Sequence, residues 1–240
     1  MSRSGAPAQT EAEKRAAGYA AVSEVRSGML LGLGTGSTVR YFLDGLAEAI
    51  GSGRLRDIRG VPTSSWTETR CRELRIPMVS LTEGAVLDLV VDGADEVDPV
   101  LDLVKGLGGA LLREKMVAQA GERLLIIVDS GKEVRVLGER APVPVEVTRF
   151  GWRSHLPLFR SLGAEPHVRR SSGGEMTVTD NGNYLIDLDF KAGVDVPGVL
   201  HEALARQAGI VETGLFLGMA DRVIVGTEEG VRIREREGDA

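Results

Sequence analysis

The 240-residue chain has little of several residue types, and each scarcity excludes a class of protein. Its single cysteine, Cys71, permits no internal disulfide, which is typical of proteins in reducing compartments. No histidine lies within four residues of another or of Cys71, so a histidine-rich metal site is not predicted. No apolar run approaches the roughly 18 residues of a membrane span, and the first residues lack the apolar core of a signal peptide. We therefore expect a cytoplasmic protein that does not enter a membrane.

The chain also has fewer basic than acidic residues: 29 lysines and arginines against 35 aspartates and glutamates, which gives a net charge of −6. A nucleic-acid binder needs a basic face against the phosphates, so that class is disfavoured. An anionic small molecule stays compatible, since a single pocket can be positive on an acidic protein. Glycine is abundant, at 31 residues, about twice its usual share of roughly 7%. We expect loops that depend on glycine's backbone freedom.

Short apolar strands alternate with helices in the first part of the chain. After a disordered lead over 1–10, helices are expected at 11–26, 39–50, 66–74 and 110–120, and strands at 29–33, 58–62, 86–91 and 124–128. A short extended segment is expected at 101–104. Such alternation predicts βαβ units and a parallel sheet.

The order of the predicted strands and helices changes near Pro142. Strands at 143–147, 167–169, 176–179, 184–190 and 210–212, with helices at 154–162 and 199–207, follow in roughly β-α-β-β-α-β order, and 222–226 with 231–234 resembles a closing pair. The predicted fold class is α/β: a Rossmann-like, mostly parallel sheet domain with an inserted ferredoxin-like α+β domain. We expect the first domain to hold residues 1–141 plus 211–240 and the second to hold 142–210.

Polar motifs follow the carboxyl ends of the early strands, the edge where open α/β sheets bind ligands. The first motif is Gly32-Leu33-Gly34-Thr35-Gly36-Ser37-Thr38, between a strand and a helix. Its free N–H groups and its hydroxyls suit a phosphate. Ser37 replaces the last small residue of the dinucleotide fingerprint, and no Gly-Lys-Ser/Thr of a P-loop is present. The alternative is an ordinary tight turn.

Three further motifs share this pattern. Asp92-Gly93-Ala94-Asp95-Glu96-Val97-Asp98 lacks EF-hand spacing and is either a set of acceptors for sugar hydroxyls or a solvated turn. Lys105 and a glycine turn lead into a helix that carries Glu114 near its start, where the helix dipole stabilises a carboxylate; a surface charge is the alternative. Asp129-Ser130-Gly131-Lys132 ends another strand and adds positive charge or forms a plain turn. Together the motifs suit proton transfer on a phosphorylated small molecule, which needs a base, an anion site and groups that stabilise an enediolate.

The first three motifs, followed by Thr179-Asp180-Asn181-Gly182-Asn183, stand in the order found in ribose-5-phosphate isomerase type A, which the chain resembles from about Lys14 to Gly230. The resemblance implies interconversion of ribose 5-phosphate and ribulose 5-phosphate, a step of the non-oxidative pentose phosphate pathway, without metal or cofactor. It implies a phosphorylated pentose as substrate, no nucleic-acid or membrane partner, and a homodimer or homotetramer.

The resemblance also implies residue roles. Glu114 matches the general base that moves a proton between C1 and C2 through a cis-enediolate, and Asp92 and Lys105 complete the catalytic set. The implied substrate-binding positions are Thr35, Gly36, Ser37, Thr38, Asp92, Gly93, Ala94, Asp95, Lys105, Gly106, Leu107, Gly108 and Lys132. Lys14 lies near a family lysine that can reach the phosphate. Leu107 stands where the family usually has glycine, which leaves the backbone contacts at 106–108 open. Gly131 stands where the family usually has serine, which removes one possible hydroxyl contact.

Three other functions fit parts of the sequence. An amino-sugar-phosphate deaminase would favour a histidine near the sheet edge, whereas all three histidines lie within 155–201. A sugar-phosphate-sensing regulator would need a helix-turn-helix, and we expect none because only a short, non-basic segment precedes the first predicted helix. An acyl-CoA transferase relative would use Glu114 as a nucleophile, but no adenine pocket is evident in the sequence.

Overall fold

The computed structural model describes residues 6–236 and divides the chain into two compact units. The first contains Met1–Ala94, Arg113–Lys132 and Met219–Ala240, and the second contains Asp95–Leu112 and Glu133–Gly218. The predicted domains share this two-part plan but place 95–112, 133–141 and 211–218 in the other part. No helix in the described range is long and apolar enough to cross a membrane.

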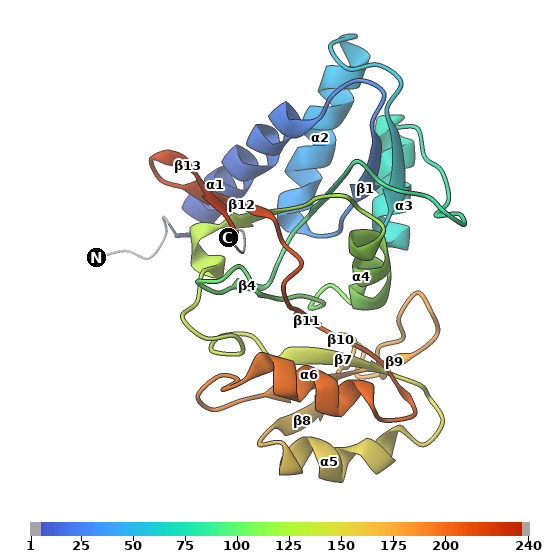
Figure 1. The fold of residues 1–240 in the computed structure, drawn as a ribbon, viewed down its shortest axis with the longest axis vertical. Coiled ribbons are helices and arrows are strands. Elements are labelled where there is room, and N and C mark those ends of the chain that lie inside the picture. Colours follow the sequence, from blue (N-terminus) through green and yellow to red (C-terminus); the bar gives the residue numbers. More distant parts are fainter. Residues whose placement is uncertain (1–5, 237–240) are drawn as a thin grey trace. The chain divides into compact units, whose positions relative to one another are not determined.

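The first unit is built on a six-stranded sheet whose order is β13-β12-β6-β3-β1-β2. Three of its strands, β1, β12 and β13, are labelled in Figure 1. The strands are β1 (Leu30–Leu33), β2 (Arg59–Pro62), β3 (Leu89–Asp92), β6 (Leu124–Asp129), β12 (Arg222–Thr227) and β13 (Gly230–Glu235). All neighbours are parallel except β12 and β13, so the expected parallel sheet and closing pair are confirmed. Because β2 and β3 lie on opposite sides of β1, the topological switch point falls between the carboxyl ends of β1 and β3.

Helices cover both faces of this sheet. The helices are α1 (Ala6–Ala21), α2 (Ser37–Gly51), α3 (Ser65–Leu74) and α4 (Leu111–Gln119), and α1 and α2 lie side by side in Figure 1. Phe42 and Leu46 of α2 pack with Leu31 and Ile127 in the main core of the unit. Each such side chain contributes about 1.5–3 kcal/mol when it leaves water. β3 and β6 are buried along their entire length, as expected for central strands covered on both faces.

Two expectations for the start of the chain are wrong. Residues 6–10 were expected to be disordered but form the first turns of α1, and this helix ends at Ala21 rather than residue 26. Pro7 is compatible with this start, because proline is tolerated in the first turn of a helix. A 3₁₀ turn over Val22–Glu24 then replaces the expected last turns. The rest of the expected lead, residues 1–5, lies outside the described residues.

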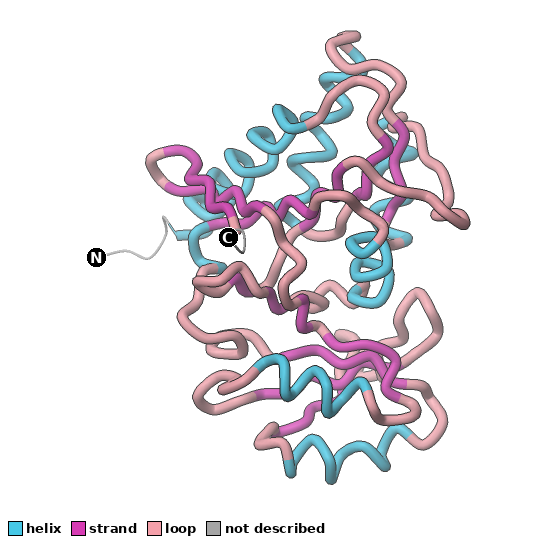
Figure 2. The backbone as a smooth tube through the Cα atoms, in the orientation of Figure 1, coloured by secondary structure: helices cyan, strands magenta, loops and turns pink. Residues whose placement is uncertain are grey.

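The second unit contains a four-stranded antiparallel sheet in the order β10-β7-β9-β8. Its elements follow the chain as β7 (Val143–Val147), α5 (Leu156–Ser161), β8 (Glu165–Val168), β9 (Tyr184–Asp189), α6 (Pro197–Ala205) and β10 (Ile210–Thr213), and this alternation can be followed in Figure 2. The β-α-β-β-α-β order confirms the ferredoxin-like prediction. Val143, Val145 and Val147 alternate onto one face of β7, where they share a core with Phe159 and Leu200.

A small three-stranded sheet completes the second unit. It pairs β4 (Glu96–Val97), β5 (Leu103–Val104) and β11 (Leu215–Phe216) in antiparallel order β11-β5-β4. Only the middle strand was expected from the sequence, because a two-residue strand is too short to show an alternating pattern. The prediction of a strand at 176–179 is wrong, because this segment makes only the isolated bridges Arg170↔Met176 and Val178↔Tyr184.

Candidate active site

The switch point of the first unit joins two of the sequence motifs. The amide of Gly34, just after β1, donates to Val91 O at 2.9 Å, and the amide of Thr35 donates to Oδ1 of Asp92 at 3.0 Å. The Gly93 amide donates to the same oxygen at 2.7 Å, and Asp92 is buried. A Cβ on Gly34 would lie 2.1 Å from Asp92 Oδ1, so only glycine allows this approach. Hydrogen bonds therefore connect the glycine loop, residues 32–38, directly to Asp92 and the end of β3.

A cluster of buried hydroxyls holds the glycine loop from its other side. Oγ1 of Thr35 lies 2.8 Å from Thr63 Oγ1, 2.7 Å from Ser64 Oγ and 2.9 Å from Thr67 Oγ1. Thr67 Oγ1 also donates to Gly34 O at 2.7 Å, and Ser64 caps α3 by accepting from the Thr67 amide. None of these three partners was predicted from the sequence. The signal that could have found them is the polar run that directly follows β2 at the same sheet edge.

The loop then leads into the amino terminus of α2. Gly36 precedes this helix with φ +125°, and no side chain of a described residue caps it. The first N–H groups of a helix lack intrahelical acceptors, so this end can receive an anion. Ser37 is exposed, whereas Thr38 is buried. The structure thus retains the feature on which the phosphate prediction depends.

Glu114 lies in the first turn of α4 and is only 4% exposed, which excludes the surface-charge alternative. Helix α4 packs closely on the sheet, because a Cβ on Gly32 would lie 2.7 Å from Val117 Cγ1. Burying a carboxylate costs free energy, and a carboxylate that is nevertheless buried at a helix amino terminus is a candidate for chemistry. The dipole of α4 favours its negative charge at this position.

The fourth motif forms a 3₁₀ turn, Ser130–Lys132, after β6. Oδ1 of buried Asp129 accepts from the Gly131 amide at 3.1 Å. Glu13 of α1 is equally buried, and its Oε2 accepts from the amide and the hydroxyl of Ser130 at 3.1 and 2.8 Å. Glu13 was not predicted from the sequence, because it lay within an expected helix and showed no pattern of its own. These contacts fix the backbone that carries Lys132.

Lys14 lies on the same helix as Glu13. Its Nζ forms an ion pair with Glu11, at 3.0 Å from Oε1.

The second unit holds the lysine loop, residues 105–109. Lys105 directly follows β5 and is only 2% exposed; its amide donates to Gly214 O at 2.8 Å, and its Nζ lies 5.3 Å from the centroid of the Phe216 ring. Such a position over a ring face stabilises a cation. The next residue, Gly106, has φ +103°, and a Cβ there would lie 2.8 Å from the Leu111 side chain. The loop therefore requires glycine at 106.

Asp95 organises the same loop. Its amide donates to Val104 O at 2.8 Å, and its Oδ2 accepts from the Leu107 amide at 2.9 Å. The leucine at position 107 therefore leaves the backbone contact intact, and its side chain is 40% exposed.

The carboxylates of the acidic motif have separate tasks. Buried Glu96 accepts from the amides of Arg140 and Ala141, both at 2.7 Å, and Asp98 Oδ1 accepts from the amides of Val100 and Asp102. Both are thus engaged with backbone. No group of three or more potential metal ligands occurs among the residues that the structure describes.

The predicted site residues are divided between the units. The first unit holds Thr35, Gly36, Ser37, Thr38, Asp92, Gly93, Ala94, Glu114 and Lys132, and the second holds Asp95, Lys105, Gly106, Leu107 and Gly108. Within the first unit, a hydrogen bond joins Asp92 to Thr35. Within the second, another joins Asp95 to the lysine loop.

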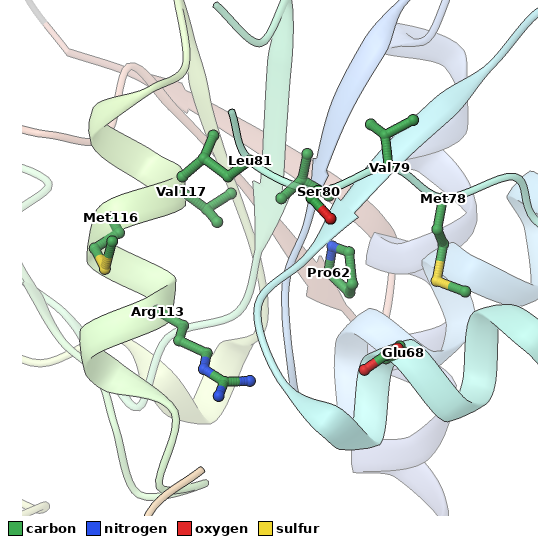
Figure 3. Close-up of a pocket in the computed structure, with 10 residues that line it drawn as sticks. Pro62, Glu68, Met78, Val79, Ser80, Leu81, Arg113, Met116 and Val117 are labelled. Atoms are coloured by element: carbon green, nitrogen blue, oxygen red, sulfur yellow. The ribbon is translucent and has the colours of Figure 1, made fainter. Parts of the chain in front are cut away.

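A pocket of about 440 Å³ in the first unit is lined by none of these residues. Figure 3 shows Arg113 of α4 and Glu68 of α3 pointing into it from opposite walls. Its remaining lining is mostly apolar: Val61, Pro62, Met78, Val79, Ser80, Leu81, Met116 and Val117. Neither Asp92 nor Glu114 lines it, so this pocket is not the predicted substrate site.

Known proteins resemble this chain over almost its entire length. A family model described as ribose 5-phosphate isomerase A (phosphoriboisomerase A) matches residues 59–230. A probable ribose-5-phosphate isomerase 2 of Arabidopsis thaliana is 44% identical over 228 residues, which are 93% of this chain and 86% of that protein. Ribose-5-phosphate isomerase A of Chloroflexus aurantiacus is 47% identical over 224 residues, 93% of each chain.

Solved structures of ribose 5-phosphate isomerases are similar to this chain over almost its entire length. Ribose 5-phosphate isomerase from Plasmodium falciparum has a TM-score of 0.92 at 34% identity, covering 95% of this chain and 100% of that one. A D-ribose-5-phosphate isomerase in complex with phospho-erythronic acid has a TM-score of 0.91 at 38% identity, covering 95% of this chain and 99% of that one.

Proposed function

Since the chain belongs to the ribose 5-phosphate isomerase A family and is an aldose–ketose isomerase that interconverts ribose 5-phosphate and ribulose 5-phosphate, we propose that Glu114 is its base. In this proposal, the Glu114 carboxylate removes the proton from C2 of the open-chain aldose and returns it to C1 of the enediolate. The reaction needs no redox partner, because the hydrogen lost at one carbon is regained at the next. It is a step of the non-oxidative pentose phosphate pathway.

The burial of Glu114 in the first turn of α4 carries this assignment. A base that takes a proton from carbon works best when it is positioned and shielded from water; triosephosphate isomerase, which performs the same kind of proton transfer, also uses a glutamate. A positioned base typically contributes roughly 10²- to 10⁴-fold in rate. The exposed carboxylates of the chain lack this shielding.

We assign the stabilisation of the enediolate charge to Lys105, and the orientation of the substrate hydroxyls at the reacting end to Asp92. The charge on the substrate oxygens grows as the proton leaves, and a buried ammonium is preorganised to meet it without solvent rearrangement. A donor of this kind is worth about 3–4 kcal/mol where it has been measured. Asp92 is oriented by the amides of Thr35 and Gly93, and Asp95 by that of Leu107, so both can accept from substrate hydroxyls in a defined direction.

In this proposal the loop before α2 and two lysines bind the phosphate. The uncapped amino terminus of α2 offers amides, and Ser37 and Thr38 add hydroxyls. Lys132, on the turn after β6, and Lys14 supply positive charge. Backbone groups that bind the substrate come from Gly36, Gly93, Ala94, Gly106 and Gly108.

One assay tests the proposal directly. Purified protein is treated with chelator and incubated with ribose 5-phosphate, and ketose formation is followed, with glucosamine 6-phosphate as the comparison substrate. We expect ketose from ribose 5-phosphate at an unchanged rate after chelation and no reaction of the amino sugar. Activity that disappears with the metal would contradict metal-free catalysis, and activity only on the amino sugar would favour a deaminase.

Assembly and location stay predictions. We propose a homodimer or homotetramer, to be measured by light scattering as two or four times the 25.6 kDa chain mass. A cytoplasmic location is proposed from the sequence; one relative, at 45% identity, is named as chloroplastic.

A further inference from the structure

We infer that the ion pair between Arg169 and Asp187 positions the lysine loop, residues 105–109, and thereby sets the place of Lys105; this inference rests on the catalytic role proposed for Lys105. Both residues belong to the same compact unit as the loop. Neither was predicted from the sequence. They act as a positioning pair, because neither side chain is assigned a contact with substrate.

The loop needs external support. Three of its five residues are glycine, and glycine loses more backbone freedom on ordering than any other residue. Gly106 and Gly109 adopt φ values of +103° and +85°, which few other residues tolerate. Ordering one residue costs roughly 1–2 kcal/mol in backbone entropy, so a loop of this composition keeps one conformation only when its polar groups are bound.

Arg169 supplies that support through two carbonyls. Its Nη1 donates to Gly106 O at 2.8 Å and to Leu107 O at 2.9 Å. These carbonyls belong to the two residues directly after Lys105. The guanidinium therefore holds the 106–107 and 107–108 peptides, which are the second and third peptides after Lys105.

Asp187 fixes the guanidinium in turn. Nε of Arg169 donates to Asp187 Oδ2 at 2.8 Å, and Nη2 donates to Oδ1, so the two side chains form a bidentate fork. Their side chains are 14% and 17% exposed, which shields the pair from the solvent that weakens surface ion pairs. Asp187 lies in β9, whose backbone pairs with β7 and β8 on both sides. The loop is thus tied to the middle of a sheet.

Other contacts hold the loop elsewhere but do not replace this one. The Lys105 amide is bound by Gly214 O and the Leu107 amide by Asp95 Oδ2. These two contacts engage N–H groups, whereas Arg169 binds the carbonyls of 106 and 107. Within the loop itself, the Gly109 amide also donates to Gly106 O, at 3.0 Å. Removing Arg169 leaves both carbonyls without their charged donor, so the 106–107 and 107–108 peptides that follow Lys105 are held less tightly.

The expected consequence is kinetic. A displacement of about 1 Å in a reacting group can cost roughly a hundredfold in rate. We therefore expect Arg169→Ala to lower kcat roughly ten- to a hundredfold and to change KM by less than about threefold, because Lys105 acts in the transition state. Asp187→Asn keeps the shape of the acceptor but removes its charge, and we expect a smaller loss of kcat in the same direction.

Arg170→Ala is the matched control. It removes the same charge from the neighbouring residue, whose exposed guanidinium donates to Gly174 O, outside the lysine loop. We expect it to leave kcat and KM unchanged. Arg169→Lys provides a variant with the charge retained: it can reach a carbonyl but cannot form the fork, so its kcat should lie between those of the wild type and Arg169→Ala.

A double-mutant cycle with Lys105→Ala decides the inference. If Arg169 acts through Lys105, adding Arg169→Ala to Lys105→Ala should lower kcat by less than about threefold further. Losses that multiply, or an Arg169→Ala enzyme as active as Arg170→Ala, would overturn the inference. If Arg169→Ala does not fold, the same cycle is run with Arg169→Lys. A Lys105→Ala enzyme with normal kcat would instead contradict the proposed role of Lys105, so the two failures are distinguishable.

Discussion

The amide of Thr35 donates a 3.0 Å hydrogen bond to Oδ1 of Asp92, across the point where the order of the parallel sheet reverses. This bond links residues 57 positions apart in the chain. It joins a predicted anion-binding loop to a predicted catalytic carboxylate, at the place where α/β folds bind their ligands. The approach depends on the absence of a side chain at position 34.

Gly34→Ala should destabilise the fold and reduce activity together. The added Cβ would lie 2.1 Å from Asp92 Oδ1, so the loop or the carboxylate must move. Forcing extra atoms into a packed interior typically costs about 1–3 kcal/mol. Thermal unfolding and kcat/KM measure the effect. Gly51→Ala is the control: no atom lies within 4 Å of its added Cβ, and it should keep full activity. Equal behaviour of the two variants would contradict the tight approach.

Thr35→Val should cost stability because it retains the shape of threonine but deletes the hydroxyl at the centre of the cluster. Its partners, Thr63, Ser64 and Thr67, would each lose a hydrogen bond in a buried place. Unsatisfied buried polar groups cost about 1–3 kcal/mol. Urea unfolding gives the free energy, and Thr69→Val, which removes an exposed hydroxyl, should change it little. An unchanged midpoint for Thr35→Val would show that the cluster does not hold the loop.

Glu114→Gln should keep the fold and lose most of kcat. Glutamine has the same size but cannot accept a proton from carbon, so we expect a fall of roughly 10²- to 10⁴-fold. The melting temperature should stay near that of the wild type. Glu122→Gln, which neutralises an exposed carboxylate just after α4, should turn over normally. Near-normal turnover in Glu114→Gln would remove it as the base.

Cys71 should be unreactive in the native protein. Burial raises the pKa of its thiol to about 12, against roughly 8.5 for a free cysteine, and only the thiolate is nucleophilic. At pH 8 we expect an aromatic disulfide reagent to label the native chain slowly and to label one thiol rapidly after unfolding in denaturant. Fast labelling of the native chain, at the rate of free glutathione, would contradict the burial.

The raised pKa of the Cys71 thiol makes the free energy of unfolding fall at alkaline pH. Because the folded state binds the Cys71 proton more tightly than the unfolded state, this group contributes fully to stability below the unfolded pKa. As the pH rises above roughly 8.5, the unfolded chain loses the proton first and the free energy of unfolding falls. Cys71→Ala should weaken this fall at alkaline pH.

Much of the fold follows from local pattern. The all-apolar run of β6 and the alternation of β9 predicted strands close to the observed places, and the change in the pattern of elements near Pro142 predicted two parts of the chain. Strands β4 and β11, which each pair with β5, could not be predicted from the sequence, because a strand of two residues shows no periodic pattern. The same holds for Glu13, whose role appears only when α1 packs beside the end of β6.

The amino-acid sequence alone determined the strand–helix alternation, the order of the glycine, acidic and lysine motifs, and the family that they resemble, because these depend on residues close together in the chain. Only the tertiary structure decided that Glu114 and Lys105 are buried, that three distant hydroxyls bind Thr35, and that Arg169 holds the carbonyl of Gly106 from 63 positions away. The physical reason is that burial and long-range hydrogen bonds are created by packing, and packing brings together segments whose separation in sequence leaves no local trace.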